Sequence, residues 1–286
     1  MSLLAPSMVA VIPQERYRDV VHERWPVKKE PHADELLSSW LHRIASANGV
    51  APRDFVRVLG LRHGMWSARL DLKLQNDVLN LLSEGSGIPR DRLSSMALQP
   101  CDYRHMPLPL VIKARRAAST WLQFCPACLG SDQHPYFRRR WRHSTRISCF
   151  IHGCGLRDRC PSCHRGITAF AQPRLVGQHV CTSCSYDLRR ASKVPVTIEA
   201  QYFEQILNRS IGTVANTLAT NNPPKWPWRR DLIAVLPTMS VSSRIRLFER
   251  SIPDDACLND DFDLPIRRSK RIMKDKIEPA RQATAR

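Results

Sequence analysis

The sequence predicts a mainly α-helical protein whose central region holds small β elements organised by metal ions. Apolar residues recur at helical spacing in the first hundred residues and again after residue 198. Between these stretches lie four pairs of metal-ligand residues, each with two residues between its members. We therefore expect an N-terminal helix-turn-helix domain, two central zinc-finger modules of the zinc-ribbon or zinc-knuckle type, and C-terminal helices.

The ligand pairs give the strongest signal in the chain. They are Cys125/Cys128, Cys149/His152, Cys160/Cys163 and Cys181/Cys184. A two-residue gap lets a tight turn direct both side chains at one ion, and four thiolate or imidazole ligands complete tetrahedral zinc. Sequential pairing predicts two structural Zn²⁺ ions, one in a Cys₃His site and one in a Cys₄ site. Interleaved pairing and exchange of a ligand with Cys154 or His164 are the alternatives that spacing leaves open.

Other uses of these cysteines fit less well. Disulfides require an oxidising compartment, and we find no secretory signal. A catalytic zinc keeps one open coordination position, whereas four protein ligands can close both predicted sites. The His-x-Glu motif of zinc deaminases does not occur in the chain. We therefore expect structural zinc and no enzymatic activity, with Cys101 and Cys257 as ordinary free thiols.

Charge indicates the kind of partner. The 286 residues include 44 Lys and Arg against 26 Asp and Glu, a formal net charge of +18. Such an excess favours a polyanion, with nucleic acid before an anionic membrane, although solubility alone could also explain it. No apolar run approaches the ~20 residues that span a bilayer. The expected localisation is cytoplasmic, without membrane association.

Changes in pattern along the chain predict the domain organisation. We expect an N-terminal arm at 1–30, a helical helix-turn-helix domain at 31–98, a linker with a basic helix at 99–124, a tandem zinc-finger region at 125–192, a C-terminal helical region at 193–252 and a disordered basic tail at 253–286.

The best helix-turn-helix candidate begins with a helix from Asp34 to about Ala47, ended by Asn48-Gly49. A second helix is predicted over Pro52–Leu59, and its outward face would carry Arg53 and Arg57. These arginines could reach phosphates or a guanine edge. A helical hairpin that does not touch DNA is the alternative. Further helices are predicted at about 71–84, at 198–218, at 228–236 and at 241–250, the last capped by Ser240. One more helix follows Gly87 and runs to about Leu98.

A second basic segment lies inside the first zinc module. Arginines alternate with aromatic residues there, and no acid occurs between Asp132 and Asp158. Guanidinium groups among aromatics suit phosphate contact, although Phe137 and Trp141 could form a small core with the arginines as a solvated rim. We expect core roles for those two aromatics and phosphate contacts for some arginines. The DNA-binding candidates are Arg53, Arg57, Arg138, Arg139, Arg140, Arg142 and Arg146.

The order of these motifs resembles the TniQ family. The resemblance rests on Pro31-His32-Ala33-Asp34-Glu35-Leu36-Leu37-Ser38-Ser39-Trp40-Leu41, on Phe124-Cys125-Pro126-Ala127-Cys128-Leu129, on Pro135-Tyr136-Phe137-Arg138-Arg139-Arg140-Trp141-Arg142 and on Cys149-x-x-His152-Gly153, and it covers about residues 25–190. It implies a non-catalytic subunit that selects the target site in DNA transposition. Such a subunit would bind DNA directly or through a CRISPR effector complex, and would recruit an AAA+ ATPase regulator that brings a DDE transposase.

Two other functions use the same features. A transcription regulator could use the helix-turn-helix and zinc fingers. A zinc-dependent nuclease would need an acidic or histidine constellation outside the four-ligand sites, and we find none with convincing spacing. The chain also lacks a Gly-x-x-x-x-Gly-Lys loop, so ATP hydrolysis would come from a partner. A homodimer is compatible with the sequence.

Overall fold

The computed structural model describes residues 25–55, 68–98, 107–109, 120–168, 171–217 and 234–251. This part of the chain is predominantly helical, as predicted. Its helices are α1 (Leu37–Ala47), α3 (Asn76–Ser86), α4 (Arg90–Met96), α5 (Pro126–Ser131), α6 (Ile198–Thr217) and α8 (Val241–Glu249), with 3-10 helices η1 (Ala68–Asp71), η2 (Arg139–Arg142), η4 (Leu188–Arg190) and η5 (Leu236–Thr238). The expected β elements are reduced, in the described residues, to isolated antiparallel bridges such as Ser148–Gly155 and Arg159–Gly166.

Several predictions lie outside the described residues. They concern the arm up to residue 24, most of the second helix of the helix-turn-helix with Arg57, Cys101, the basic helix before residue 120, the helix at 228–236 up to residue 233, Cys257 and the basic tail. None of the helices within the described ranges is both long and apolar enough to cross a membrane.

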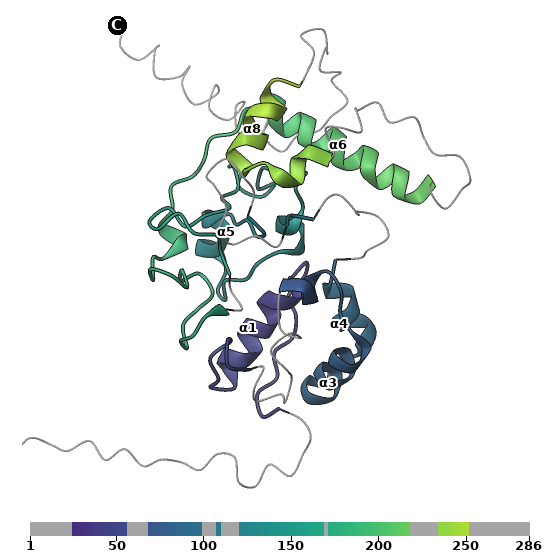
Figure 1. Ribbon diagram of the computed structural model, residues 1–286, viewed down its shortest axis with the longest axis vertical. Coiled ribbons are helices and arrows are strands. Elements are labelled where there is room, and N and C mark those ends of the chain that lie inside the picture. Colours follow the sequence, from purple (N-terminus) through teal and green to yellow (C-terminus); the bar gives the residue numbers. More distant parts are fainter. Residues whose placement is uncertain are drawn as a thin grey trace, which may run out of the picture.

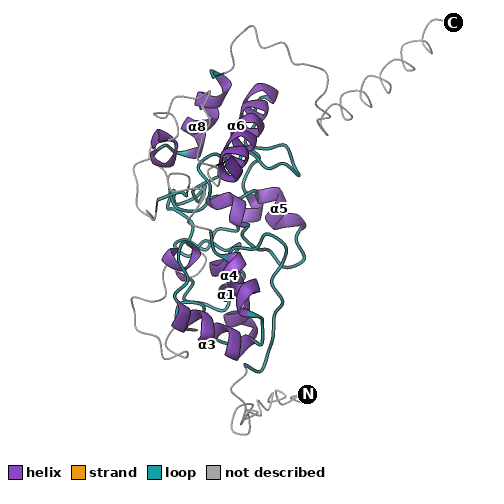
Figure 2. Cartoon of the chain, turned by 90° about the vertical axis from the view of Figure 1, so that its right-hand side faces the viewer, coloured by secondary structure: helices purple, strands orange, loops and turns teal. Residues whose placement is uncertain are grey.

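The elements follow one another along the long axis of the molecule. Helices α1, α3 and α4 lie at one end, α5 and the loops around it lie in the middle, and α6 and α8 lie at the other end (Figures 1 and 2). The central loops therefore separate the two helical ends and contact both.

The N-terminal end has its own apolar core. The stripe predicted on α1 is buried, with Trp40 and Ile44 fully inaccessible, and it packs against α3 and α4 through Val78, Leu82 and Leu93. Helical spacing placed these side chains on one face, and burying that face provides most of the stabilisation of such short helices.

Helix α1 begins later than predicted. It starts at Leu37 because Asp34 adopts a left-handed conformation with φ 57° and the main chain of Glu35 forms an antiparallel β-bridge with that of Arg138. The first turn of α1 contacts two acids, since the Glu35 carboxylate accepts from the Ser39 Oγ at 3.0 Å and a more distant acid contacts Ser38. The carboxylate of Asp71 accepts hydrogen bonds from the main-chain N and the Oγ of Ser38, both at 2.8 Å, in the first turn of α1.

The predicted end of α1 is confirmed. Gly49 has φ 74°, a conformation that glycine adopts without a steric penalty. The Asn48 amide donates to the carbonyls of Ile44 and Val27 at 2.8 and 2.9 Å. Residues 52–54 form a turn and Phe55 is buried in the N-terminal core. Since residues 56–67 are outside the described part, the helix-turn-helix remains a prediction.

A second core runs from the central loops to the C-terminal helices. It contains most of the cysteines of the two ligand clusters, though not the exposed Cys184, together with Phe124, Phe137 and Trp141. It continues into α6 and α8, where the rings of Phe203 and Phe248 meet edge to face at 4.8 Å. The apolar core is therefore continuous across residue 192, and Ser240 caps α8 as predicted, its Oγ accepting from the Ser243 N at 3.2 Å.

Candidate metal centres and basic surface

The first ligand cluster combines a helix with a turn. Cys125 is the N-cap of α5 and its Sγ accepts from the main-chain N of Cys128 at 3.4 Å, so the first helical turn places both sulfurs on one side. The Sγ atoms of Cys128 and Cys149 lie 3.4 Å apart. The Nδ1 atom of His152 lies 3.2 to 3.7 Å from the three sulfurs.

The second cluster is built from two similar turns. The Sγ atoms of Cys160 and Cys184 are 3.6 Å apart, and those of Cys163 and Cys181 are 3.7 Å apart. In each turn the main-chain N of the first cysteine donates to the carbonyl five residues later, and its carbonyl accepts from the N four residues later. The residue four positions on has positive φ, as at His164 and Ser185.

The turn at Cys149 has the same geometry. Its N donates to the Cys154 carbonyl at 2.8 Å, its carbonyl accepts from the Gly153 N at 2.7 Å, and Gly153 has φ 60°. Three of the four ligand pairs thus sit in one repeated knuckle, whose hydrogen bonds fix the direction of the first sulfur.

The ligand atoms fall into two groups that could each hold a metal ion. Cys125, Cys128, Cys149 and His152 form one group and Cys160, Cys163, Cys181 and Cys184 form the other, with all ligand atoms of a group within 4.8 Å of one another. A tetrahedral ion with Zn–S bonds of about 2.3 Å separates two thiolates by about 3.8 Å. The observed distances therefore suit such an ion without rearrangement.

The two clusters differ in burial. Cys125, Cys128 and Cys149 are at most 2% exposed, whereas Cys184 lies at the surface. Cys154 is buried with its Sγ 3.6 Å from that of Cys125, yet it does not belong to the group of four, and neither does His164. The structure thus groups the candidate ligands in sequential order, with four protein side chains in each group.

Two of the predicted DNA-binding arginines lie inside the protein. Arg138 is 4% exposed, pairs with Asp132 at 2.9 Å and lies over the rings of Tyr136 and Trp141. Arg142 is fully buried and donates to the carbonyls of Leu108 and Trp121. Burial lowers its pKa to about 10, although the negative charge of Asp71 acts in the opposite direction.

These two side chains cannot reach a phosphate in this conformation. They support the core beside Phe137 and Trp141, which are buried as expected. The prediction of phosphate contact for Arg138 and Arg142 is therefore corrected to a structural role.

The other described candidates are partly accessible. Arg139 and Arg140 both pair with Asp34, and Arg140 also lies 4.1 Å from the ring centroid of Phe150, a side chain that is 63% exposed. Arg146 lies 3.7 Å from Glu204. Arg53 is the most exposed of the described DNA-binding candidates, and its Nε lies 3.8 Å from the Oδ1 of Asp54.

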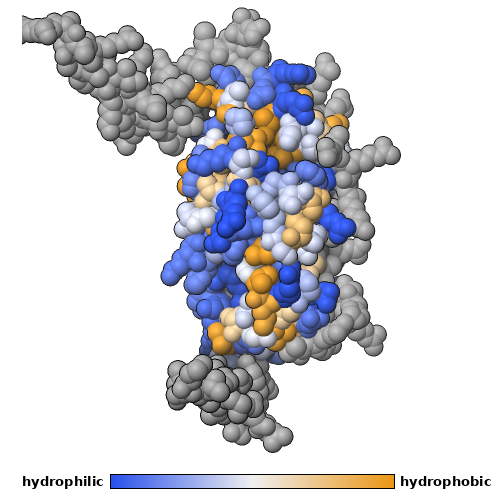
Figure 3. Space-filling view, turned by 90° about the vertical axis from the view of Figure 1, so that its left-hand side faces the viewer, coloured by the Kyte–Doolittle hydropathy of each residue, from blue (hydrophilic) through white to orange (hydrophobic). Residues whose placement is uncertain are grey.

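The surface of the molecule is mixed in polarity. Figure 3 shows one face, on which strongly hydrophilic patches alternate with smaller apolar ones. The acidic partners Asp34 and Glu204 lie far from residues 138–146 in sequence. The composition of that short segment therefore could not predict these ion pairs. The exposed ring of Phe150, at the tip of the Cys149 turn, was also not singled out from the sequence.

Comparison with known proteins identifies part of the chain. Residues 26–156 match the family model named TniQ. This chain carries a TniQ domain. No curated protein matches the chain. The TniQ family is associated with transposition and DNA binding, and its members are generally non-catalytic adaptors.

The TniQ domain contains the first ligand cluster and the accessible arginines but not the second ligand cluster. It begins beside α1 and ends at Leu156, so it includes the first ligand cluster, η2 and the partly accessible arginines. The second cluster, α6 and α8 follow it. The resemblance predicted for residues 25–190 is thus confirmed over 26–156.

Proposed function

We propose that this protein is a non-catalytic, DNA-binding adaptor that selects the target site in transposition and recruits an AAA+ regulator and a DDE transposase. The observation that carries this proposal is the TniQ domain at residues 26–156, because that family is associated with transposition and DNA binding. A CRISPR effector complex is a further partner that could direct the adaptor to its target, and the adaptor could act as a homodimer.

In this proposal each ligand cluster holds one structural Zn²⁺ ion. The ligands are Cys125, Cys128, Cys149 and His152 for the first ion and Cys160, Cys163, Cys181 and Cys184 for the second. Sulfur and imidazole ligands in groups of four are the preferred set of structural zinc. Because each set is complete without a water molecule, the ions would order the chain and would not activate a substrate.

The DNA contacts are assigned to the accessible arginines. One carboxylate, that of Asp34, faces both Arg139 and Arg140, so this pair keeps a net positive charge. The neighbouring Phe150 could stack on a base while Arg140 binds a phosphate. Arg53 and Arg146 extend the surface, and Arg57 joins the candidates although it lies outside the described residues.

The DNA-binding part is tested by fluorescence anisotropy with a labelled duplex at several salt concentrations. Replacing Arg139 and Arg140 by glutamate should weaken binding and reduce the salt slope by about 1.8, since each lost phosphate contact removes about 0.9. The matched control changes the charge of Arg246 and Arg250, two exposed residues of α8 and its end, in the same way. Equal slopes for the two double variants would contradict the assignment.

Recruitment needs a separate measurement. Co-purification with an AAA+ ATPase encoded beside this protein, with and without ATP and DNA, should retain the ATPase. A complex that never forms under these conditions would remove the adaptor role while leaving DNA binding intact.

A further inference from the structure

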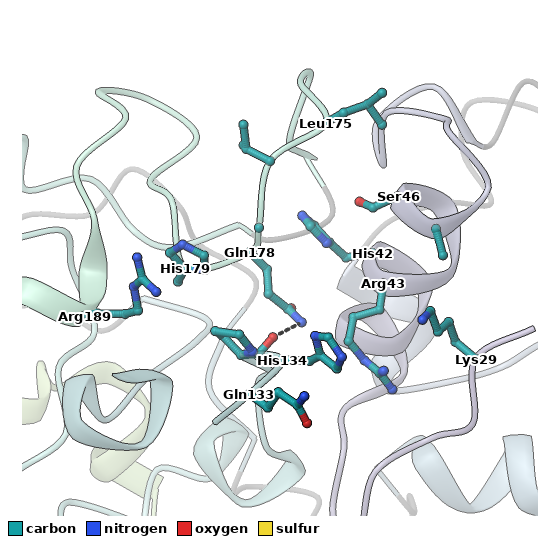
Figure 4. Close-up of a pocket in the computed structure, with 14 residues that line it drawn as sticks. Lys29, His42, Arg43, Ser46, Gln133, His134, Leu175, Gln178, His179 and Arg189 are labelled. Atoms are coloured by element: carbon teal, nitrogen blue, oxygen red, sulfur yellow. Dashed lines mark hydrogen bonds between the residues drawn. The ribbon is translucent and has the colours of Figure 1, made fainter. Parts of the chain in front are cut away.

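A cavity of about 480 Å³ lies between α1 and the loop that precedes Cys181. Four separate segments line it: the chain before α1, α1 itself, residues 133–135 and residues 175–179, with Arg189 at one side. Its volume is within the range of small-molecule sites. Figure 4 shows His42 projecting from α1 toward the segment that carries Gln178. Both metal clusters lie elsewhere, and none of their ligands lines this cavity.

The inner wall, formed by His42, Ser46 and Gln178, contains polar atoms that lack partners among the described residues. His42 is 2% exposed, and no described residue forms a hydrogen bond with its Nε2. The same absence holds for the buried Oγ of Ser46 and the buried Oε1 of Gln178. The Gln178 amide has a fixed orientation, because its Nε2 donates to the Pro135 carbonyl at 2.8 Å. Unpaired buried polar atoms are costly, so several of them on side chains that line one cavity indicate that a ligand completes their hydrogen bonds.

Among the described residues that line the cavity, all the charged side chains are basic. Its titratable lining residues are Lys29, His42, Arg43, His134, His179 and Arg189, and none of the fourteen lining residues is acidic. Arg43 and Arg189 pair with Glu35 and Asp187. Lys29 forms no ion pair within the described part of the chain, so its ammonium group is the cation at the rim that a ligand could use.

The two ends of the cavity suit different chemical groups of a ligand. The inner wall is formed by His42, Ser46 and Gln178, and Lys29 lies at the rim. The Gln178 Oε1 is an acceptor only, and burial, the largest cause, lowers the pKa of His42 to about 3, so this imidazole is neutral at pH 7. The ligand should therefore carry hydrogen-bond donors at its inner end, which the N–H groups of an amine supply, and a negative charge near Lys29. Apolar contact from Pro135, Leu175 and Val176 favours a flat body between the two ends.

We propose that this cavity binds a nucleotide, with an amino-bearing nucleobase against His42, Ser46 and Gln178 and its phosphate at Lys29. The nucleotide is either free or an unpaired residue of a nucleic-acid strand. This binding site is distinct from the duplex contacts of Arg139 and Arg140 and does not depend on the adaptor role.

The test uses the full zinc-loaded protein and isothermal titration with the monophosphates CMP and UMP. CMP should bind at least about fivefold more tightly than UMP, because uracil places a carbonyl oxygen where cytosine has its amine. Ser46→Ala should weaken CMP binding about fivefold while leaving thermal stability unchanged, since the Ser46 hydroxyl has no partner among the residues that the structure describes. Lys29→Glu should weaken CMP binding about tenfold or more. Lys28→Glu is its matched control, an exposed neighbour that does not line the cavity.

Labelled oligo(dC) and oligo(dT) strands distinguish the two sources. If the nucleotide is part of a strand, oligo(dC) should bind more tightly than CMP and lose affinity in Ser46→Ala and Lys29→Glu. If it is free, CMP should bind as tightly as the strand. The proposal is overturned if neither CMP nor oligo(dC) saturates the protein, or if both bind equally well to Ser46→Ala, Lys29→Glu and Lys28→Glu. Duplex binding, measured on the same variants, should remain unchanged in each case.

Discussion

Replacing Cys149 by serine tests the metal assignment against a matched cysteine in the same loop. Cys149 and Cys154 are both buried, at 2% and 5% exposure, and both sulfurs are close to the first cluster. Of these two cysteines, only Cys149 belongs to the first group of four candidate ligands. We therefore expect Cys149→Ser to abolish metal binding at the first cluster and Cys154→Ser to leave both ions in place.

The size of the effect follows from what surrounds the first cluster. A structural zinc in a zinc-finger peptide contributes about 10–16 kcal/mol at pH 7, whereas a whole domain is stable by only about 5–15 kcal/mol. The first cluster shares its core with Phe137, Trp141 and the facing side chains of α6 and α8. Losing the ion should therefore unfold the central loops and release α6 and α8. The core of α1, α3 and α4 forms a separate cluster and should keep its structure.

Two measurements check this expectation. Elemental analysis should give two zinc equivalents for the natural protein and Cys154→Ser, and at most one for Cys149→Ser. Hydrogen exchange in Cys149→Ser should accelerate at residues 120–168, 198–209 and 241–249, while 76–96 remain protected. Two equivalents in Cys149→Ser, or one in Cys154→Ser, would refute the ligand set. Unchanged protection of α6 and α8 would refute the shared core.

Three further predictions concern single side chains. Arg142→Met should lower the free energy of unfolding in urea by about 3–5 kcal/mol, because it leaves Asp71 buried without its cation, while Arg139→Met at the surface should cost less than about 1 kcal/mol. Burial raises the pKa of Asp71 to about 6, against the opposing charge of Arg142, so between pH 4 and 6 the folded state binds a proton that the unfolded state releases. Stability from this group should fall as pH rises through that window, and the pH dependence of the melting temperature should lose this component in Asp71→Asn. Phe150→Ala should barely change the melting temperature, since the ring is 63% exposed, but should weaken DNA binding in anisotropy measurements by removing the contact with Arg140.

The two ligand clusters were the part of the candidate site that sequence could predict most directly. The ligand spacing Cys-x-x-Cys is local, and the knuckle that produces it closes within six residues through its own main-chain hydrogen bonds. The order of the helices was predictable for a related reason. Helical periodicity determines which face is buried, whatever the partner of that face, so α3, α4, α6 and α8 appear within a few residues of the expected ranges, α3 with the largest offset.

The fate of the arginines could not be predicted from their neighbours in sequence. The segment between Asp132 and Asp158 contains no acid, which suggested uncompensated charge. Folding brings acids from elsewhere: Asp34 reaches Arg139 and Arg140, and Glu204 on α6 reaches Arg146. The burial of Arg142 depends on carbonyls of other segments in the same way. Charge counted along a short window therefore overstates the charge available to a ligand.

The nucleotide cavity had no sequence signal at all. Its walls come from four segments and from Arg189, and no fixed spacing links His42, Ser46 and Gln178. Each of these residues alone reads as an ordinary polar residue of a helix or loop. Only their convergence, with buried atoms that lack partners, distinguishes them from the surrounding surface.

The first metal cluster and the basic surface are coupled through the packing between them. Residues 138–142 lie between two hydrogen-bonded positions. On one side the Leu36 N donates to the Phe137 carbonyl at 2.9 Å, and on the other the Gln123 amide donates to the His143 carbonyl at 3.1 Å. Gln123 is two residues from Cys125, so an ion at the first cluster would hold this position in place. Zinc would then support DNA binding without touching DNA, because it fixes the segment that presents Arg139 and Arg140. A variant that loses the first ion should consequently bind duplex DNA more weakly than its remaining positive charge implies, even where α1 and its core stay folded.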